Sequence, residues 1–277
     1  MMPALTDRSD RSMTRAVQDN LFEFWGSLRK SPDMRVDQTP EMIRYVTGVP
    51  FPLMNGVLRA RFPVGAADKK VHEALAPFRE RKLPMMWWTA PSDTPSDLPR
   101  RLVAAGLAEV EQAPGMAIDL QKLNEDVDSP RGLVIQGVGS QDDLADCNQV
   151  LAAGFGMPEF VAEELAKHLR AIGSWPDGPW LGYLGRLEGR PVATSLVAFT
   201  AGVAGIYNVA TLEEARGRGI GAAMTLAPLR EARQMGYRIA ILHSSAMGYG
   251  VYRRLGFREY CKIGQYVWTP ESGEQQA

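Results

Sequence analysis

Cysteines, long apolar runs and an excess of one charge sign are all scarce in this sequence. The only two cysteines, Cys147 and Cys261, are too few for a disulfide framework, and their surroundings do not resemble a metal site. No apolar run approaches the ~20 residues that span a bilayer, and the N-terminus lacks the apolar core of a signal peptide. The net charge of -1 argues against a general nucleic-acid binder. We therefore expect a cytoplasmic protein that uses no metal and binds neither nucleic acid nor membrane.

A glycine-rich stretch is the most informative feature that the sequence does contain. It joins an expected strand, residues 205–211, to an expected helix, residues 222–235. The first amides of a helix have no partner within it, and the helix dipole places roughly half a positive charge there. Gly217, Gly219 and Gly221 allow close approach of an anion, and Arg216 and Arg218 add charged donors. This arrangement predicts a pyrophosphate site.

The spacing of these residues narrows the type of pyrophosphate site. A nucleotide triphosphatase loop requires Lys and then Ser or Thr after its last glycine, whereas Ala222 follows Gly221 here. A dinucleotide fold requires Gly-x-Gly-x-x-Gly and an acidic residue further on. The spacing Arg-x-x-Gly-x-Gly after Val209-Ala210-Thr211 instead resembles the coenzyme A loop of the GNAT acetyltransferase superfamily. The alternative is an ordinary glycine-rich turn before a helix.

A second motif follows in the order that this superfamily has. A strand is expected over residues 237–243, with two serines after it. The segment Val251-Tyr252-Arg253-Arg254-Leu255-Gly256-Phe257 then resembles the superfamily's closing motif, a short helix that carries a Tyr and ends at Leu-Gly-Phe. Gly256 would stand just after the end of that helix. The resemblance covers residues 133–268.

The resemblance implies a mixed α/β (α+β) fold in which the fourth and fifth strands splay apart. The pantetheine arm of acetyl-CoA would lie in this gap and pair with the backbone of the fourth strand. The residues expected to bind the coenzyme are Val209, Ala210, Thr211, Arg216, Gly217, Arg218, Gly219, Ile220, Gly221, Ser244 and Ser245. The two serines are equally well explained as ordinary hydroxyls at a strand end.

Tyr252 is the residue that we expect to act in catalysis. In direct transfer an amine attacks the thioester carbonyl and a thiolate leaves. A phenol with a pKa of ~10 suits protonation of that thiolate better than it suits base catalysis. The alternative is that Tyr252 only packs under the final strand. No general base stands out, and His243 and Glu159 are candidates by location alone.

The N-terminal half repeats features of the C-terminal half. Residues 75–80, Leu-Ala-Pro-Phe-Arg-Glu, match residues 226–231, Leu-Ala-Pro-Leu-Arg-Glu, at an offset of 151 residues. At this offset the coenzyme loop falls on residues 65–70, where Asp68 replaces a glycine. Further on, Arg100-Arg101-Leu102 parallels Arg253-Arg254-Leu255 with a short insertion, so that Pro99 takes the place of the tyrosine. We therefore expect two GNAT-like mixed-sheet domains with flanking helices: a degenerate domain over 1–130 and a catalytic domain over 131–277, joined by the acidic stretch 124–130.

These features together predict an acyltransferase that moves an acetyl group from acetyl-CoA to a primary amine of a small molecule or peptide. Two alternatives stay open. One is a catalytically silent sensor or scaffold that binds acyl-CoA, which the retained Tyr252 disfavours. The other is a protein-lysine acetyltransferase, which would require an acidic, open acceptor face. We expect a monomer or a homodimer.

Overall fold

The chain passes twice through each of two units, so that both are assembled from segments distant in sequence. The computed structural model describes residues 4–173 and 178–270. Unit 1 consists of Met1–Phe24 and Pro114–Tyr260, and unit 2 of Trp25–Ala113 and Cys261–Ala277. The unit boundaries fall within helix α1 (Asp10–Ser27) and within strands β5 (Ala108–Asp119) and β11 (Arg258–Trp268). This division differs from the expected one at residue 130.

Unit 1 is built on a sheet with the strand order β5-β10-β9-β8-β7-β6. The strands that lie wholly within it are β6 (Leu133–Gly137), β7 (Trp180–Leu187), β8 (Arg190–Thr200), β9 (Val203–Thr211) and β10 (Ile239–His243). Neighbouring strands are antiparallel except for β9 and β10, which run parallel. A parallel pair needs a crossover connection, and helix α6 (Ile220–Gln234) provides it.

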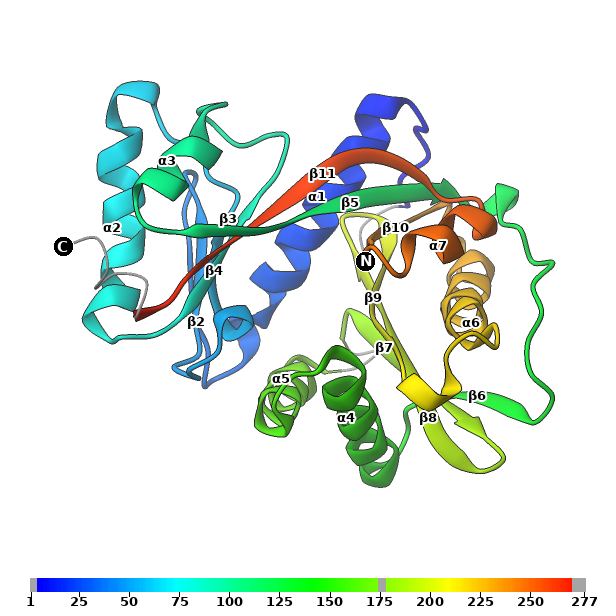
Figure 1. Ribbon diagram of the computed structural model, residues 1–277. Helices are drawn as coiled ribbons and strands as arrows, with labels where there is room; N and C mark the ends of the chain where they lie inside the picture. Colours follow the sequence, from blue (N-terminus) through cyan, green and yellow to red (C-terminus); the bar gives the residue numbers. More distant parts are fainter. Residues whose placement is uncertain (1–3, 174–177, 271–277) are drawn as a thin grey trace. The chain divides into compact units, whose positions relative to one another are not determined.

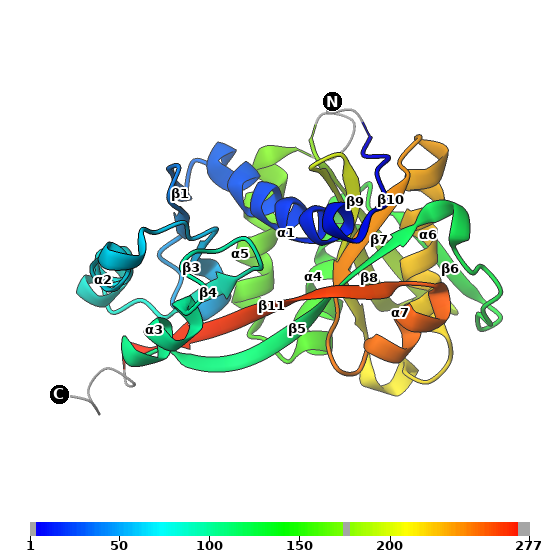
Figure 2. The same ribbon diagram turned by 90° about the horizontal axis from the view of Figure 1, so that it is seen from above.

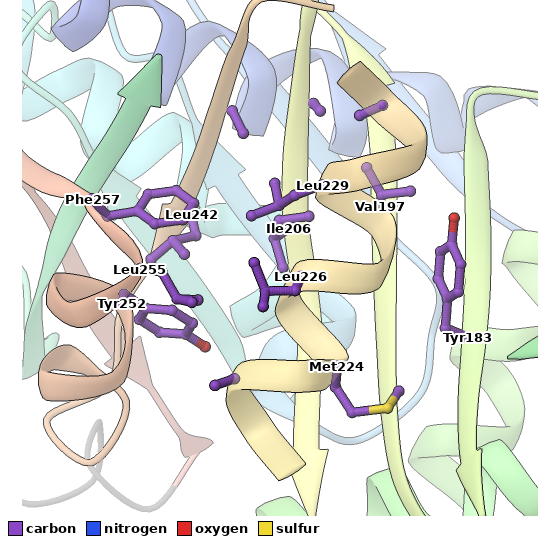
Figure 3. Close-up of a cluster of buried hydrophobic side chains, with 14 of the residues drawn as sticks. Tyr183, Val197, Ile206, Met224, Leu226, Leu229, Leu242, Tyr252, Leu255 and Phe257 are labelled. Carbon is purple, nitrogen blue, oxygen red and sulfur yellow. The ribbon is translucent and has the colours of Figure 1, made fainter. Parts of the chain in front are cut away.

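Helices cover both faces of this sheet. Helix α6 lies on one face, and helices α4 (Gln141–Phe155) and α5 (Glu159–Ile172) lie on the other (Figures 1 and 2). Leu226 and Leu229 of α6 are buried beside Ile206 of β9 and Leu242 of β10 (Figure 3). Full burial of an aliphatic side chain of this size contributes roughly 1.5–3 kcal/mol, so this face holds α6 firmly on the sheet.

A proline within α6 strengthens the link between helix and sheet. Pro228 has no N–H, so the carbonyl of Met224, four residues earlier, lacks its helical donor. The buried hydroxyl of Ser195 in β8 donates to this carbonyl at 2.8 Å. The proline therefore leaves no unsatisfied polar group in the core.

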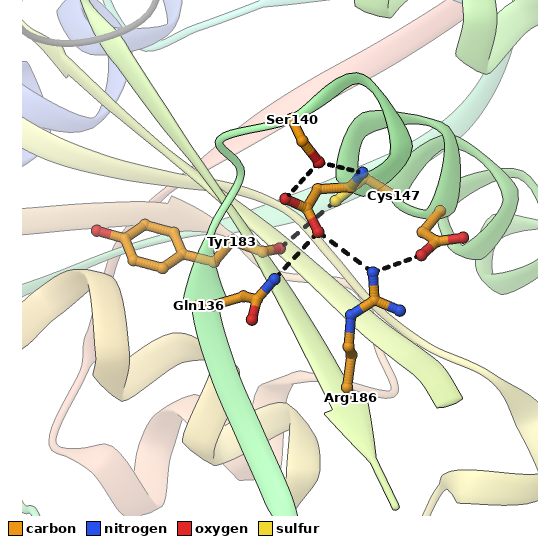
Figure 4. Close-up of polar contacts among 7 residues, drawn as sticks. Gln136, Ser140, Cys147, Tyr183 and Arg186 are labelled. Atoms are coloured by element: carbon orange, nitrogen blue, oxygen red, sulfur yellow. Dashed lines mark hydrogen bonds and ion pairs between the residues drawn. The ribbon is translucent and has the colours of Figure 1, made fainter. Parts of the chain in front are cut away.

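A polar cluster fixes the start of α4 against β7 (Figure 4). Ser140 caps the helix, because its Oγ accepts a hydrogen bond from the N–H of Asp143 at 3.1 Å. Arg186 of β7 binds Asp143 at 3.2 Å and Asp146 at 2.6 Å. The bond from Ser140 and the guanidinium of Arg186 hold the pKa of Asp143 below its usual range. These contacts position α4 over the sheet.

The strands of unit 2 lie in the order β1-β2-β3-β4-β11. They are β1 (Arg35–Gln38), β2 (Ile43–Val46), β3 (Asn55–Leu58), β4 (Met85–Thr89) and the end of β11. Strands β3 and β4 are parallel and are joined through helix α2 (Ala67–Glu80), and helix α3 (Leu98–Ala104) follows β4. In the same way as β2 and β3 are followed by α2, β4 and α3, strands β8 and β9 are followed by α6, β10 and helix α7 (Tyr249–Leu255). This agreement supports the predicted duplication.

The last strand of the N-terminal half, β5, pairs with a strand of unit 1. The last strand of the C-terminal half, β11, pairs with a strand of unit 2. The end of β5 pairs with β10, from Gly115 with His243 to Asp119 with Ile239. The end of β11 pairs with β4, from Gly264 with Thr89 to Trp268 with Met85. This exchange, together with the inclusion of Met1–Phe24 in unit 1, makes both units discontinuous in sequence.

Candidate functional site

Strands β9 and β10 part where the sequence predicts a gap. Their pairing runs from Ala204 with Ala240 to Ile206 with Leu242 and then ends. Beyond Ile206, β9 continues to Thr211 and pairs there only with β8. Within the described chain, the backbone groups on the gap side of this segment have no strand partner. They are therefore available to an extended ligand.

The residues predicted to line this gap differ in exposure. Val209 and Thr211 are half-buried, whereas Ala210 is buried. A Cβ on Gly154 at the end of α4 would lie only 2.7 Å from Cβ of Ala210. The side chain of Ala210 therefore faces α4, and this residue has only its backbone to offer a ligand.

Asn208 interrupts β9 within the gap. Its φ of 52° is left-handed, and the register with β8 shifts between Thr194 and Leu196, which marks a β-bulge. Asparagine adopts this conformation more readily than most residues, and such positions cluster at functional sites. Sequence reasoning does not single out Asn208. The only signal is an amide side chain within an otherwise apolar strand.

The glycine-rich loop forms an open cradle at the start of α6. Gly217 and Gly219 have φ values of 75° and 80°, which glycine adopts without strain. Gly219 is the N-cap residue, and no side chain caps the helix. Ile220 has a buried side chain and offers only its amide, and the Cβ position of Gly221 is open, with Thr211 Oγ1 at 3.9 Å. The first amides of α6 are thus free to bind an anion.

The two arginines of the loop have different surroundings. Arg216 donates through Nε to the carbonyl of Thr211 at 3.1 Å and through Nη2 to that of Gly154 at 3.2 Å. This guanidinium therefore ties the loop to the ends of β9 and α4. Arg218 is exposed and forms no ion pair with any described residue. Arg218 is the cation of the loop that remains free for a phosphate.

The acidic stretch 124–130 packs against this loop and α6. A Cβ on Gly219 would lie 2.1 Å from the carbonyl oxygen of Asp128. Glu125 binds Arg230 and Arg233 of α6, each at 2.6 Å. The stretch is therefore held on the helix, and any side chain at position 219 would displace it.

Tyr252 of α7 is buried, with 9% of its surface exposed. Its ring lies edge-on to Phe257 at 6.1 Å, and its hydroxyl points toward α6 (Figure 3). This hydroxyl has no hydrogen-bond partner among the described residues. Burial raises the pKa of Tyr252 to about 12, so the phenol keeps its proton at neutral pH.

Ser244 and Ser245 connect β10 to α7. Ser244 is buried, and its hydroxyl donates to the carbonyl of Ser245 at 2.8 Å. Ser245 is exposed, and its Oγ accepts a hydrogen bond from the N–H of Gly248 at 3.2 Å. Both hydroxyls have local partners, and of the two only Ser245 is open to a ligand.

A polar cluster closes the inner end of the gap. Tyr207 donates to Asn20 Oδ1 at 2.7 Å, and Asn20, fully buried on α1, donates to the carbonyl of Thr200 at 3.0 Å. The ring of His243 lies 6.0 Å from that of Tyr207. Burial lowers the pKa of His243 to about 4, and its Nε2 is shielded from solvent without a hydrogen-bond partner. Sequence reasoning missed Asn20, since no local pattern marks it.

Neither base candidate is singled out by its surroundings. His243 is neutral at pH 7, and its free nitrogen is closed off from solvent. Glu159 is exposed in the first turn of α5. The structure therefore does not assign the general base.

The equivalent position in unit 2 is closed by an ion pair. Asp68, in the first turn of α2, binds Arg101 of α3 at 2.7 Å, and Arg101 also binds Asp97 at 3.0 Å. A carboxylate already occupies the place of an anion at this helix start. This supports the prediction that the N-terminal half does not bind the coenzyme.

Two features are absent from residues 4–173 and 178–270. No group of three or more His, Cys, Asp or Glu side chains there is placed to hold a metal ion. No helix in the same ranges is long and apolar enough to cross a membrane.

The parted strands, the uncapped glycine loop and the buried tyrosine all lie between residues 139 and 260. Residues 139–260 match the family described as the acetyltransferase (GNAT) domain. Residues 139–260 therefore form a GNAT-type domain, as the sequence predicts. No curated protein matches the chain.

Several solved structures have a similar fold over nearly the whole chain. A GCN5-related N-acetyltransferase from Kribbella flavida is 19% identical, with a TM-score of 0.70 over 92% of this chain and 95% of its own. One from Sphaerobacter thermophilus is 18% identical, with a TM-score of 0.65 over 97% and 95%. A tandem GNAT protein from the clavulanic acid biosynthesis pathway is 14% identical, with a TM-score of 0.60 over 97% and 98%. At these identities the similarity establishes the fold.

Proposed function

We propose that this protein moves an acetyl group from acetyl-CoA to a primary amine of a small molecule or peptide, at one site per chain. The observation that carries the proposal is the uncapped start of α6 at Gly219, next to the unpaired edge of β9. The pyrophosphate would bind the first amides of α6 and Arg218. The pantetheine arm would pair with the backbone of Val209 and Thr211.

The direction of β9 indicates where the chemistry would take place. Because β9 runs into the loop, an arm that starts at the loop passes Thr211 first and brings its thioester toward Asn208. There an amine attacks the carbonyl, so that the C–N bond forms and the C–S bond breaks. The amine loses a proton, and the leaving thiolate gains one. Tyr252, buried and protonated, would supply the proton to the sulfur.

Calorimetric titration with acetyl-CoA tests the binding site. Gly221→Glu is the blocking variant, because this position is open and a carboxylate in the first turn suits the helix but repels a phosphate. Gly221→Ala is the matched control. Gly219 is unsuitable, since a side chain there would collide with the backbone of Asp128. We expect one site per chain in wild type and Gly221→Ala, and no binding in Gly221→Glu.

Three results would contradict the proposal. Two sites per chain would show that the ion-paired counterpart in unit 2 also binds. Unchanged binding by Gly221→Glu would place the phosphates elsewhere. A panel of primary amines with detection of the released thiol tests the acceptor class, and binding without turnover on that panel would refute it.

A further inference from the structure

A cavity of about 40 Å³ lies in unit 1 between the sheet and helices α4 and α5. Its walls are mostly apolar and come from both helices and from β7, β8 and β9. They include Leu144, Leu151, Leu165, Ala166, Trp180 and Leu196.

The polar groups on the cavity wall are few and uncharged. The hydroxyls of Thr194 and Ser195 are already bonded to backbone carbonyls, at 3.2 and 2.8 Å. Burial raises the pKa of Cys147 to about 11, so it remains a thiol. Asn148 and Asn208 also line the cavity, and neither amide has a hydrogen-bond partner among the described residues.

Among the described residues, neither a carboxylate nor a cation lines the cavity. An ammonium group that entered it would lose its hydration without a counter-charge, which is strongly unfavourable. The occupant that this lining suits is therefore an uncharged apolar group. The reacting amine itself does not fit this description.

Asn208 connects the cavity to the reaction site. It lines the cavity, and it also forms the bulge of β9 toward which the thioester end of the coenzyme arm would point. A chain attached to the thioester carbonyl is delivered to this wall by the coenzyme itself. An apolar substituent of the amine would have to reach the cavity past the acyl group.

We propose that this cavity binds the acyl chain of an acyl-CoA longer than acetyl-CoA, so that the enzyme prefers short acyl groups of roughly three to five carbons. This inference rests on the proposed function. One water-sized sphere occupies ~10–15 Å³ on this measure, so the cavity has room for about three groups of methylene size. The reaction is otherwise the same: the amine takes the acyl group, and the coenzyme leaves as the thiol.

The preference is measured as kcat/KM for acetyl-, propionyl-, butyryl- and hexanoyl-CoA with one amine acceptor. We expect an increase of roughly fourfold per buried methylene up to butyryl-CoA, and a decrease with hexanoyl-CoA. Calorimetric Kd values for the same four compounds give the comparison without an acceptor.

Two variants change the volume of the cavity in opposite directions. Ala166→Leu fills it and should remove the preference for butyryl-CoA while acetyl transfer continues. Leu196→Ala enlarges it and should shift the optimum toward hexanoyl-CoA. Glu163→Leu, on the exposed side of α5, is the matched control and should keep the wild-type ratios.

Equal kcat/KM values for acetyl-CoA and butyryl-CoA in wild type would overturn the proposal. A ratio of these kcat/KM values that stays unchanged in both cavity variants would also overturn it. If Ala166→Leu instead impairs only bulky amines, whatever the acyl group, the cavity belongs to the acceptor and the proposal is wrong. Failure of the proposed function looks different, because then no acyl-CoA of any length binds.

Discussion

His243 should make the stability of unit 1 sensitive to mild acid. Burial lowers the pKa of its imidazole from 6.5 to about 4, and its Nε2 has no hydrogen-bond partner to compensate a positive charge. The unfolded chain therefore binds a proton near pH 6.5, whereas the folded protein does so only near pH 4. The contribution of this group to the free energy of unfolding is complete above pH 6.5, and it is lost as the pH falls from 6.5 to about 4.

The size of this effect follows from the two pKa values. One unit of pKa difference corresponds to about 1.4 kcal/mol, so the full loss below pH 4 is about 3 kcal/mol. At pH 5 the unfolded state is almost fully protonated at this site and the folded state is not. The expected loss between pH 7 and pH 5 is therefore about 2 kcal/mol.

Urea denaturation at pH 7, 6 and 5, followed by circular dichroism, measures this loss. Carboxylates also titrate in acid, so the relevant quantity is the difference between wild type and His243→Gln. Between pH 7 and pH 5, the free energy of unfolding of His243→Gln should decrease by about 2 kcal/mol less than that of wild type. His72→Gln, at an exposed site on α2, is the control and should behave as wild type. Equal losses in wild type and His243→Gln would refute the reasoning.

Three further variants test other contacts of unit 1. Tyr252→Phe should lower kcat by roughly 10²–10⁴-fold with an unchanged calorimetric Kd for acetyl-CoA; an unchanged kcat would mean that the tyrosine only packs. Asn20→Ala leaves the hydroxyl of Tyr207 and a strand carbonyl without partners, so urea denaturation should show a loss of about 1–3 kcal/mol. Arg186→Ala removes two partly exposed ion pairs, so urea denaturation should show a loss of at most about 1 kcal/mol, and a clearly larger loss would contradict this expectation.

The coenzyme loop could be predicted from the sequence because its properties are local. The glycines at 217 and 219 do adopt left-handed conformations, and β9 ends at Thr211 as expected. Helix α6 begins at Ile220, two residues before the expected start at Ala222. A short run of residues fixes the backbone here, and no distant contact is needed to explain it.

Features that depend on distant contacts could not be predicted in the same way. The sequence assigns Arg216 to the phosphates, but its partners include Gly154 of α4, which only the folded chain brings near. The left-handed φ of Asn208 depends on the register between β9 and β8. The expected domain boundary at residue 130 follows from the sequence repeat. The exchange of β5 and β11 instead depends on pairing between strands that are far apart in the sequence. Helical periodicity predicts α1 but not the burial of Asn20 beside Thr200.

The exchange of β5 and β11 has a consequence for synthesis on the ribosome. β5 emerges early, but its partner β10 is complete only at residue 243, and β11 pairs with β4 only from residue 264 onward. Until then the N-terminal half carries an open strand edge at β4, and such edges promote association between chains. An early stop of translation, or a truncation at residue 130, would leave that edge permanently uncovered. Completion of the last strand is therefore the step of synthesis that covers this edge.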